Sequence, residues 1–113
     1  MDSSHTYIAD LAKLIEVPTD GILSRILYKD AQVNVTLFGF DTGQELSEHT
    51  AVSPAIIQIL QGEARLIIGG EEREGHAGTW IHMPARTPHS LLAKTPVVML
   101  LLLLKSRAES RDS

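Results

Sequence analysis

The amino-acid sequence predicts an all-β protein, a small sandwich or barrel of short antiparallel strands. Two observations support this fold class. Apolar runs of about six to eight residues recur along most of the chain, which is typical of strands. Short segments rich in Gly, Pro and Asp separate each run from the next. The length of 113 residues suits a single domain with one hydrophobic core.

The first element in order is an N-terminal extension, residues 1–20, which is predicted to hold a short helix. Asp10 is placed to cap a short turn, and Pro18 ends the segment. The apolar residues of this segment follow a helix-like spacing; they are Tyr7, Ile8, Leu11, Leu14 and Ile15.

Residues 21–105 are predicted to form the β domain, and the polar residues 106–113 a C-terminal tail. Gly69-Gly70 permits the positive φ angles of a tight hairpin turn, and Asp41 with Gly43 predicts a second hairpin. The predicted strands are 22–28, 33–40, 45–50, 55–60, 64–68, 79–83, 90–93 and 97–104.

Charge and composition exclude several classes of partner. The net charge is −4, and Lys and Arg are scattered, which argues against binding to nucleic acid or to an anionic membrane. The apolar run 97–104 is too short to cross a bilayer, which takes about 20 residues as a helix. The chain has no cysteine, and its first ten residues lack the pattern of a signal peptide, so a cytoplasmic protein is expected.

Two segments resemble the two motifs of the cupin superfamily. The first motif reads Gly, five residues, His, one residue, His, three or four residues, Glu, six residues, Gly. Gly43, His49 and Gly62 fall on it with the correct spacing, whereas Ala51 and Ala55 stand at the second His and the Glu.

The second motif reads Gly, five residues, Pro, one residue, Gly, two residues, His, three residues, Asn. Gly78, Pro84 and His89 match it, with Arg86 in place of the middle Gly and Ala93 in place of the Asn. This resemblance to small RmlC-like cupins implies a double-stranded β-helix, a jelly-roll barrel that spans residues 21–105.

The resemblance also implies a metal site that is incomplete in this chain. In cupins the motif ligands bind one divalent transition metal (Fe, Mn, Ni, Cu or Zn), and here only His49 and His89 carry over. Two imidazoles alone rarely hold such an ion, because stable sites generally use three or more ligands. His49 and His89 could instead be a buried pair that hydrogen-bonds to each other, to the backbone or to water.

A third metal ligand has few candidates. His82 lies on a predicted strand, but alternation does not say which way it faces. Glu45 and Ser47 share the strand alternation of His49, whereas Gln58 has that of the opposite face. For His82 and Glu45, a position on the rim or surface is the simpler expectation.

Two functions remain open. In the first, the barrel pocket binds a small molecule and the metal site is degenerate. In the second, the chain is a metal-dependent oxygenase, isomerase or lyase in which a nonstandard ligand completes the site. The sequence has no cysteine nucleophile and no phosphate-binding loop to suggest other chemistry. The predicted pocket residues are His49, Ala51, Ala55, Ile57 and His89.

Three further expectations concern surfaces and packing. The aromatic side chains Phe38, Phe40 and Trp80 are expected in the core. Arg25 and Arg86 could meet an anionic ligand at the barrel mouth, although a surface role is the default. The run 97–104 is apolar on both sides and exceeds what one small core needs, which predicts a homodimer.

Overall fold

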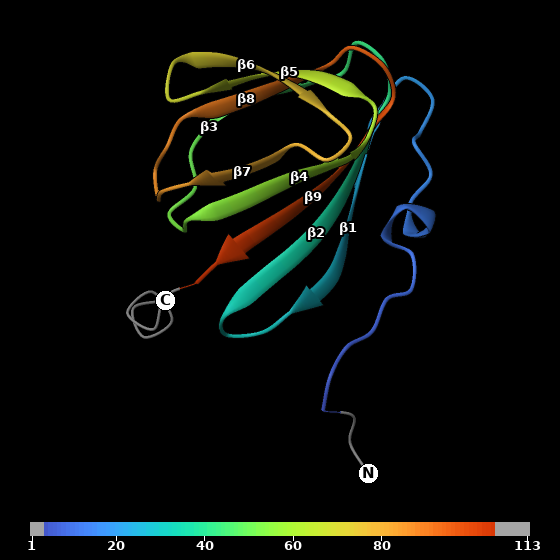
Figure 1. Ribbon diagram of the computed structural model, residues 1–113, viewed down its shortest axis with the longest axis vertical. Helices are drawn as coiled ribbons and strands as arrows, with labels where there is room; N and C mark the ends of the chain where they lie inside the picture. The colour runs from blue at the N-terminus through green and yellow to red at the C-terminus, as the bar shows by residue number, and fades with distance from the viewer. Residues whose placement is uncertain (1–3, 106–113) are drawn as a thin grey trace.

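The computed structural model describes residues 4–105 and confirms the all-β prediction. Two antiparallel sheets face each other as a jelly roll (Figure 1), one with the strand order β1-β2-β9-β4-β7 and the other with the order β3-β8-β5-β6. The strands are β1 (Ile22–Lys29), β2 (Val33–Phe40), β3 (Glu45–His49), β4 (Ala55–Gln61), β5 (Glu63–Ile68), β6 (Glu71–His76), β7 (Trp80–Met83), β8 (His89–Ala93) and β9 (Val97–Leu104).

Strand β6 is the element that the apolar pattern did not predict. Its sequence, EEREGH, is polar, yet it pairs along its length with β5. The predicted hairpin turn joins the two strands, with φ of +56° at Gly69 and +83° at Gly70. Because β6 is an edge strand, it needs one neighbour only, and charged side chains are the usual protection of such an edge.

The hairpin predicted at Asp41 and Gly43 is wrong. Strands β2 and β3 belong to different sheets, so residues 41–44 carry the chain from one sheet to the other. The Asp41 carboxylate accepts hydrogen bonds from the backbone N–H groups of Asp20 (2.7 Å) and Thr42 (2.8 Å). This bonding shapes a crossing connection rather than a tight turn between paired strands.

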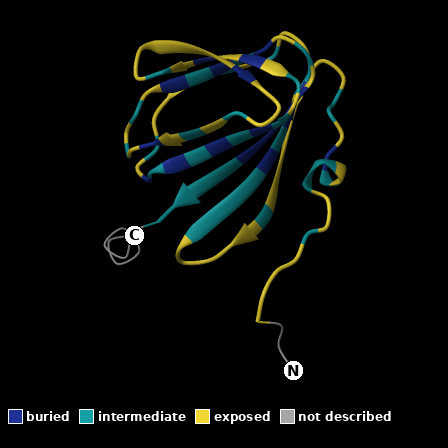
Figure 2. Ribbon diagram, in the orientation of Figure 1, coloured by how far each residue is buried: buried dark blue, intermediate teal, exposed yellow. Residues whose placement is uncertain are grey.

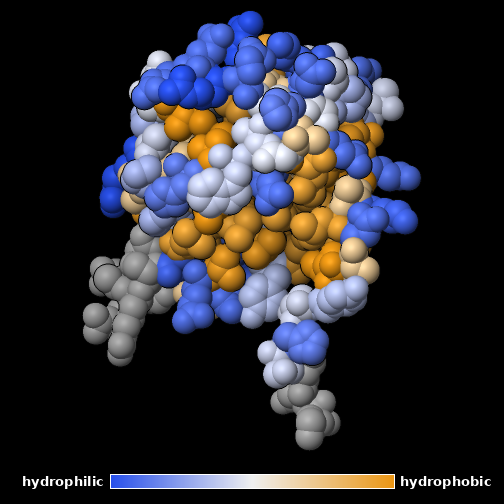
Figure 3. All heavy atoms as spheres, in the orientation of Figure 1, coloured by the Kyte–Doolittle hydropathy of each residue, from blue (hydrophilic) through white to orange (hydrophobic). Residues whose placement is uncertain are grey.

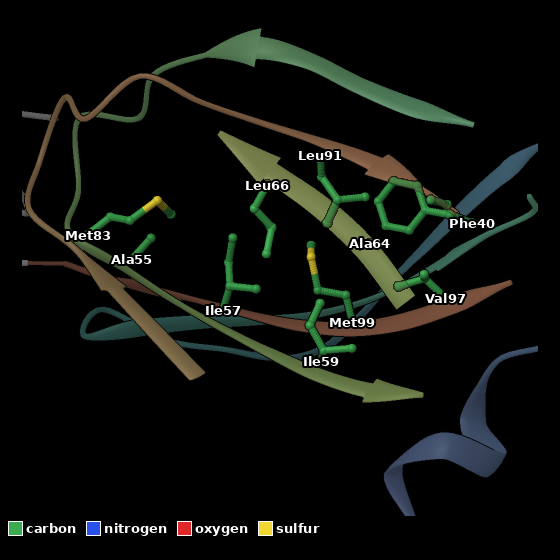
Figure 4. Close-up of a cluster of buried hydrophobic side chains, with 11 residues drawn as sticks. Phe40, Ala55, Ile57, Ile59, Ala64, Leu66, Met83, Leu91, Val97 and Met99 are labelled. Carbon is green, nitrogen blue, oxygen red and sulfur yellow. The ribbon is translucent and has the colours of Figure 1, made fainter. Parts of the chain in front are cut away.

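The main core fills the space between the two sheets (Figure 4), and Figure 2 shows the alternation of buried and exposed residues along the strands that line it. Phe38 and Phe40 stack with their ring centroids 5.9 Å apart, as expected of core aromatics. Trp80 was expected here and is instead 59% exposed, because it alternates with Ile81 and faces away from the interior. The core residues are Phe40, Ala55, Ile57, Ile59, Ala64, Leu66, Met83, Leu91, Ala93, Val97 and Met99.

A second cluster lies on the outer face of the five-stranded sheet and is covered by the N-terminal segment. Ile15 packs there with Leu37, Val98 and Leu100. Arg25 also faces this side, where its Nη1 donates to the carbonyl oxygen of Leu14 (2.9 Å), so Arg25 does not lie at the barrel mouth.

The predicted N-terminal helix is only a 3-10 turn, η1 (Leu11–Leu14). Asp10 occupies the N-cap position, but its side chain makes no capping bond and lies 3.7 Å from the Lys13 ammonium. A helix this short is not stable by itself, so packing of Ile15 and its neighbours on the sheet decides the path of the chain.

Strand β9 lies in the middle of the five-stranded sheet and is covered on both faces by this same chain. Residues 97–100 are buried and residues 101–104 are half-buried. The chain itself therefore covers much of the run from which a dimer was predicted. Within residues 4–105, no helix has the length and apolar character needed to cross a membrane. The predicted tail, 106–113, lies outside the described residues.

Candidate functional site

The structure brings His49 and His89 together. They are direct cross-strand partners on β3 and β8, with ring centroids 4.1 Å apart and ring planes at 58°. His89 is buried and His49 is exposed. The pair stands on the inner face of the four-stranded sheet, since Leu91, two residues after His89, belongs to the interior core.

Each imidazole is held by a backbone carbonyl. Nδ1 of His49 lies 2.8 Å from the carbonyl oxygen of Ser47, and Nδ1 of His89 lies 2.8 Å from that of Thr87. A carbonyl oxygen only accepts, so Nδ1 carries the proton in each ring. In the neutral form of each ring, the Nε2 lone pair is then the one available to a hydrogen bond or a metal.

Burial keeps His89 neutral. Desolvation is the main cause that lowers the pKa of its imidazole, and the neighbouring His49 lowers this pKa further, while the bond to Thr87 raises it. His89 therefore offers an acceptor rather than a positive charge.

The residues around the pair do not fit a tightly held divalent metal. At the remaining two motif positions, Ala51 lies in the loop between β3 and β4, and Ala55 is 2% exposed and paired with the buried Met83. Figure 4 shows the side chains of Ala55 and Met83 next to each other at one end of the core. No group of three or more His, Cys, Asp or Glu side chains among residues 4–105 could hold a metal ion. Two imidazoles fall short of the usual three or four ligands.

The candidates for a third ligand lie elsewhere. His82 pairs with Ile56, faces the opposite side from Met83 and is exposed. Glu45 does not share the face of His49, because a register shift lies between Leu46 and His49. Strict alternation would put Glu45 on the face of His49, but the extra residue on β3 turns it to the outer face beside Leu92, so Glu45 lies on the surface as expected.

The wall opposite the imidazoles holds two polar residues that the sequence analysis missed. Asn34 and Thr36 pair with Leu103 and Leu101, which pack against the interior core, so all four face inward. The Thr36 hydroxyl donates to Asn34 Oδ1 (3.0 Å), and both residues are half-buried. The signal was their alternation with Val33, Val35 and Leu37 in a strand that is otherwise apolar.

Arg86, in the turn next to His89, has a backbone conformation that favours glycine. Its φ is +64°, at the position where the cupin motif has its middle Gly. Its backbone N–H donates to the carbonyl oxygen of Ala51 (2.7 Å), which ties the turn between β7 and β8 to the loop between β3 and β4. This hydrogen bond therefore joins the loop that follows His49 to the turn that precedes His89.

These features define a small jelly-roll barrel with a pair of imidazoles on its inner wall. The Cupin domain family matches residues 36–103, well over half of the chain, and the chain belongs to this family.

Solved structures agree with this assignment. A conserved protein of unknown function from Streptococcus pyogenes is 33% identical, with a TM-score of 0.82 over 93% of this chain and 92% of that one. A cupin superfamily protein from Desulfitobacterium hafniense is 29% identical, with a TM-score of 0.80 over 85% and 88% of the two chains. An RmlC-like cupin from Shewanella frigidimarina, 18% identical, shares the fold with a TM-score of 0.76 over 93% and 94%. No curated protein matches this sequence.

Proposed function

We propose that this cupin binds a small organic molecule at the imidazole pair and does so without a metal. The observation that carries the proposal is the pair itself. Both Nδ1 atoms are bonded to carbonyl oxygens, which leaves two Nε2 acceptors on tilted rings whose centroids lie 4.1 Å apart. The carboxylate of the cupin motif is absent, because Ala55 stands at its position. Such acceptors suit a ligand that carries hydroxyl or other donor groups.

The surroundings of the pair support the same class of ligand. Ala55 and Ile57 provide an apolar floor, and Ala51 lies in the adjoining loop. On the facing wall, the Asn34 amide adds a donor beside the Thr36 hydroxyl. Apolar walls with a few oriented polar groups are typical of sites for small organic ligands.

Histidine resonances provide the test of this proposal. A panel of small hydroxylated organic molecules is titrated while the ¹⁵N resonances of the imidazoles are recorded. A bound ligand should shift the Nε2 signals of His49 and His89. His76 is the matched control, because its Nδ1 also faces a carbonyl oxygen, that of Ala77 at 3.0 Å, but it lies exposed at the end of β6. Equal shifts of all three histidines would contradict a site at the pair.

A second candidate function is a divalent-metal-dependent enzyme of the oxygenase, isomerase or lyase class. The observation in its favour is that metal-bound histidines also donate their second ring N–H to a carbonyl oxygen, as His49 and His89 do. Completing such a site requires ligands that residues 4–105 do not place beside the pair.

Elemental analysis separates the two candidates. Protein purified without an affinity tag or chelator is incubated with iron, manganese, nickel, copper and zinc, dialysed, and analysed per chain. The double variant Ala51→His/Ala55→Glu restores the motif ligands and is the positive control. We expect metal in the double variant and none in the wild type. Near-stoichiometric metal in the wild type, lost in His49→Ala, would favour the enzyme.

We also propose that the chain forms a homodimer through strand β1. This strand pairs with β2 on one side and is an edge of its sheet on the other. Several of its apolar side chains are exposed, which is unusual for an edge strand and favours pairing or packing with a second copy. These residues are Ile22, Leu23, Ile26 and Tyr28.

Light scattering at micromolar concentration tests the dimer. Wild type should have twice the mass of one chain. Ile26→Lys, which puts a charge on the most exposed of these apolar residues of β1, should shift the mass to that of a monomer. Val52→Lys, at an equally exposed apolar residue outside β1, is the control and should stay dimeric. A monomeric wild type would contradict the proposal.

A further inference from the structure

A groove of about 450 Å³ runs between the edge strands β6 and β7, apart from the imidazole pair. Figure 1 shows these two strands facing each other across the gap between the sheets. In Figure 3, hydrophilic side chains crowd the rim formed by the four-stranded sheet, whereas hydrophobic ones spread below it over the five-stranded sheet. The groove is lined by Ile68, Glu71, Arg73, Glu74, Thr79, Trp80, Ile81 and His82.

The pairing of β5 with β6 explains why a groove forms here. Glu71 and Arg73 are the partners of Ile68 and Leu66, so they project to the inner face of their sheet. Gly75 has the same orientation, but a Cβ there would lie 2.8 Å from Leu66 and 3.5 Å from Ile59. The absence of a side chain at Gly75 lets β6 pack closely against Leu66 and Ile59 at that end, whereas Glu71 and Arg73 line the groove at the other end of the strand.

The charges in the groove are already balanced. The Glu71 carboxylate forms an ion pair with the guanidinium of Arg73, and the Glu74 carboxylate lies 3.0 Å from the ammonium of Lys94, which is just outside the groove. These groups offer donors and acceptors without a net charge to neutralise. The groove therefore suits a neutral ligand rich in hydrogen-bonding groups rather than an ion.

Trp80 gives this groove an aromatic wall. It is the only tryptophan of the chain, and it is 59% exposed although its sheet has a hydrophobic core on the inner side. A large indole beside polar groups provides a flat apolar surface for a ligand that has both apolar C–H faces and polar edges. Ile68 and Ile81 extend the apolar surface toward the interior.

We propose that the groove between β6 and β7 binds a neutral polyhydroxylated ligand, such as a sugar ring. The ring stacks its C–H face on the indole of Trp80. Its hydroxyl groups donate to the carboxylates of Glu71 and Glu74 and accept from the guanidinium of Arg73. The volume of the groove is within the range of roughly 300–1,000 Å³ that is usual for small-molecule sites. Neither histidine of the imidazole pair lines the groove, although Ile68 is the cross-strand partner of His89. The proposal does not rest on the function proposed above, because other residues make its contacts.

Intrinsic fluorescence tests the proposal, because the single tryptophan lies in the groove. The probes are glucose, galactose, mannose and their common disaccharides, titrated into the full chain. We expect at least one of them to give a saturable change in Trp80 emission. Glu71→Gln and Arg73→Gln, which keep the fluorophore, should each weaken that binding by about tenfold, the effect of losing one good contact.

Calorimetry with the same sugar complements the fluorescence. Trp80→Ala should abolish the heat of binding, and Tyr7→Ala should leave it unchanged, since Tyr7 is an exposed aromatic outside the groove. Circular dichroism confirms that each variant is folded. The proposal is overturned if no sugar of the panel binds, or if Trp80→Ala binds as the wild type does. It is also overturned if tetramethylammonium quenches Trp80 at concentrations at which the sugars do not, because the groove would then be a site for organic cations.

Discussion

The two ends of the barrel are built from the same strands but differ in how completely side chains fill them. Toward one end, Phe40, Ile59, Ala64 and Val97 are all fully buried. Toward the other end, several inward-facing residues of the same sheets are only half-buried, as Leu103 and Asn34 are, although their neighbours Ala55 and Met83 are buried. A single strand, β9, runs from the filled end at Val97 to the open end at Leu104.

This difference separates residues that mainly stabilise the fold, at the filled end, from residues that are available to a ligand, at the open end. At the filled end, each side chain touches protein on all sides, so that a change in volume costs free energy of folding. At the open end, an imidazole pair and two polar side chains face the interior without complete burial. We expect substitutions to affect mainly unfolding at the first end and mainly ligand binding at the second.

The largest effect is expected at Gly62, in the turn between β4 and β5. Its φ is +90°, and a Cβ would lie 2.0 Å from the backbone oxygen of Pro96. Backbone cannot move aside as a flexible side chain does, so Gly62→Ala should lower the free energy of unfolding by about 4 kcal/mol or more. Urea denaturation measures this loss.

Gly43→Ala is the matched control for this variant. Gly43 also has a positive φ, +84°, but nothing lies within 4 Å of the position of a Cβ. Only backbone strain applies there, and the expected loss is about 1 kcal/mol. Equal losses in the two variants would show that strain, and not the contact with Pro96, makes Gly62 necessary.

A pair of truncations compares the two ends directly. Ile59→Ala, at the filled end, should lower the free energy of unfolding by about 3–4 kcal/mol, because the cavity is enclosed on all sides. Leu103→Ala, at the open end, should cost only about 1–2 kcal/mol, since the side chain is already partly exposed. Similar losses in urea denaturation would mean that the open end is as tightly packed as the filled one.

His89 should make stability depend on pH. Burial lowers the pKa of its imidazole in the folded chain, whereas the unfolded chain takes up the proton near pH 6.5. As the pH falls from 7.5 to 5.5, the unfolded state binds more protons, so the free energy of unfolding decreases. Denaturation at both pH values should show a smaller decrease in His89→Gln than in the wild type. An unchanged decrease would mean that other groups cause it.

The smallest expected effect is a gain at Arg86. Its positive φ is unfavourable for a residue with a Cβ, so Arg86→Gly should raise the free energy of unfolding by about 0.5–1 kcal/mol. A thermal melt should show the higher stability. A loss of stability would instead indicate that the arginine side chain makes a stabilising contact at the mouth.

Most of the strands could be predicted, because short apolar runs separated by turn residues recur along the chain, which is typical of strands. Strand β6 could not, since its residues are polar and its pairing with β5 comes from the Gly69-Gly70 turn. Alternation alone would put Glu45 on the face of His49, but a one-residue shift on β3 reverses the face, and Glu45 lies on the surface, as was expected of it. Trp80 was placed in the core from its residue type alone, although its position on β7 decides its exposure.

The sequence by itself determined the fold class, the family and the spacing that sets His49 opposite His89, because these depend on local patterns and on motif positions along the chain. Only the tertiary structure decided what surrounds that pair. The carbonyl oxygens of Ser47 and Thr87 orient the imidazoles, Asn34 and Thr36 point inward from the other sheet, and Gly75 leaves room for Leu66 and Ile59. These relations join residues through strand register and sheet packing, which no local pattern specifies.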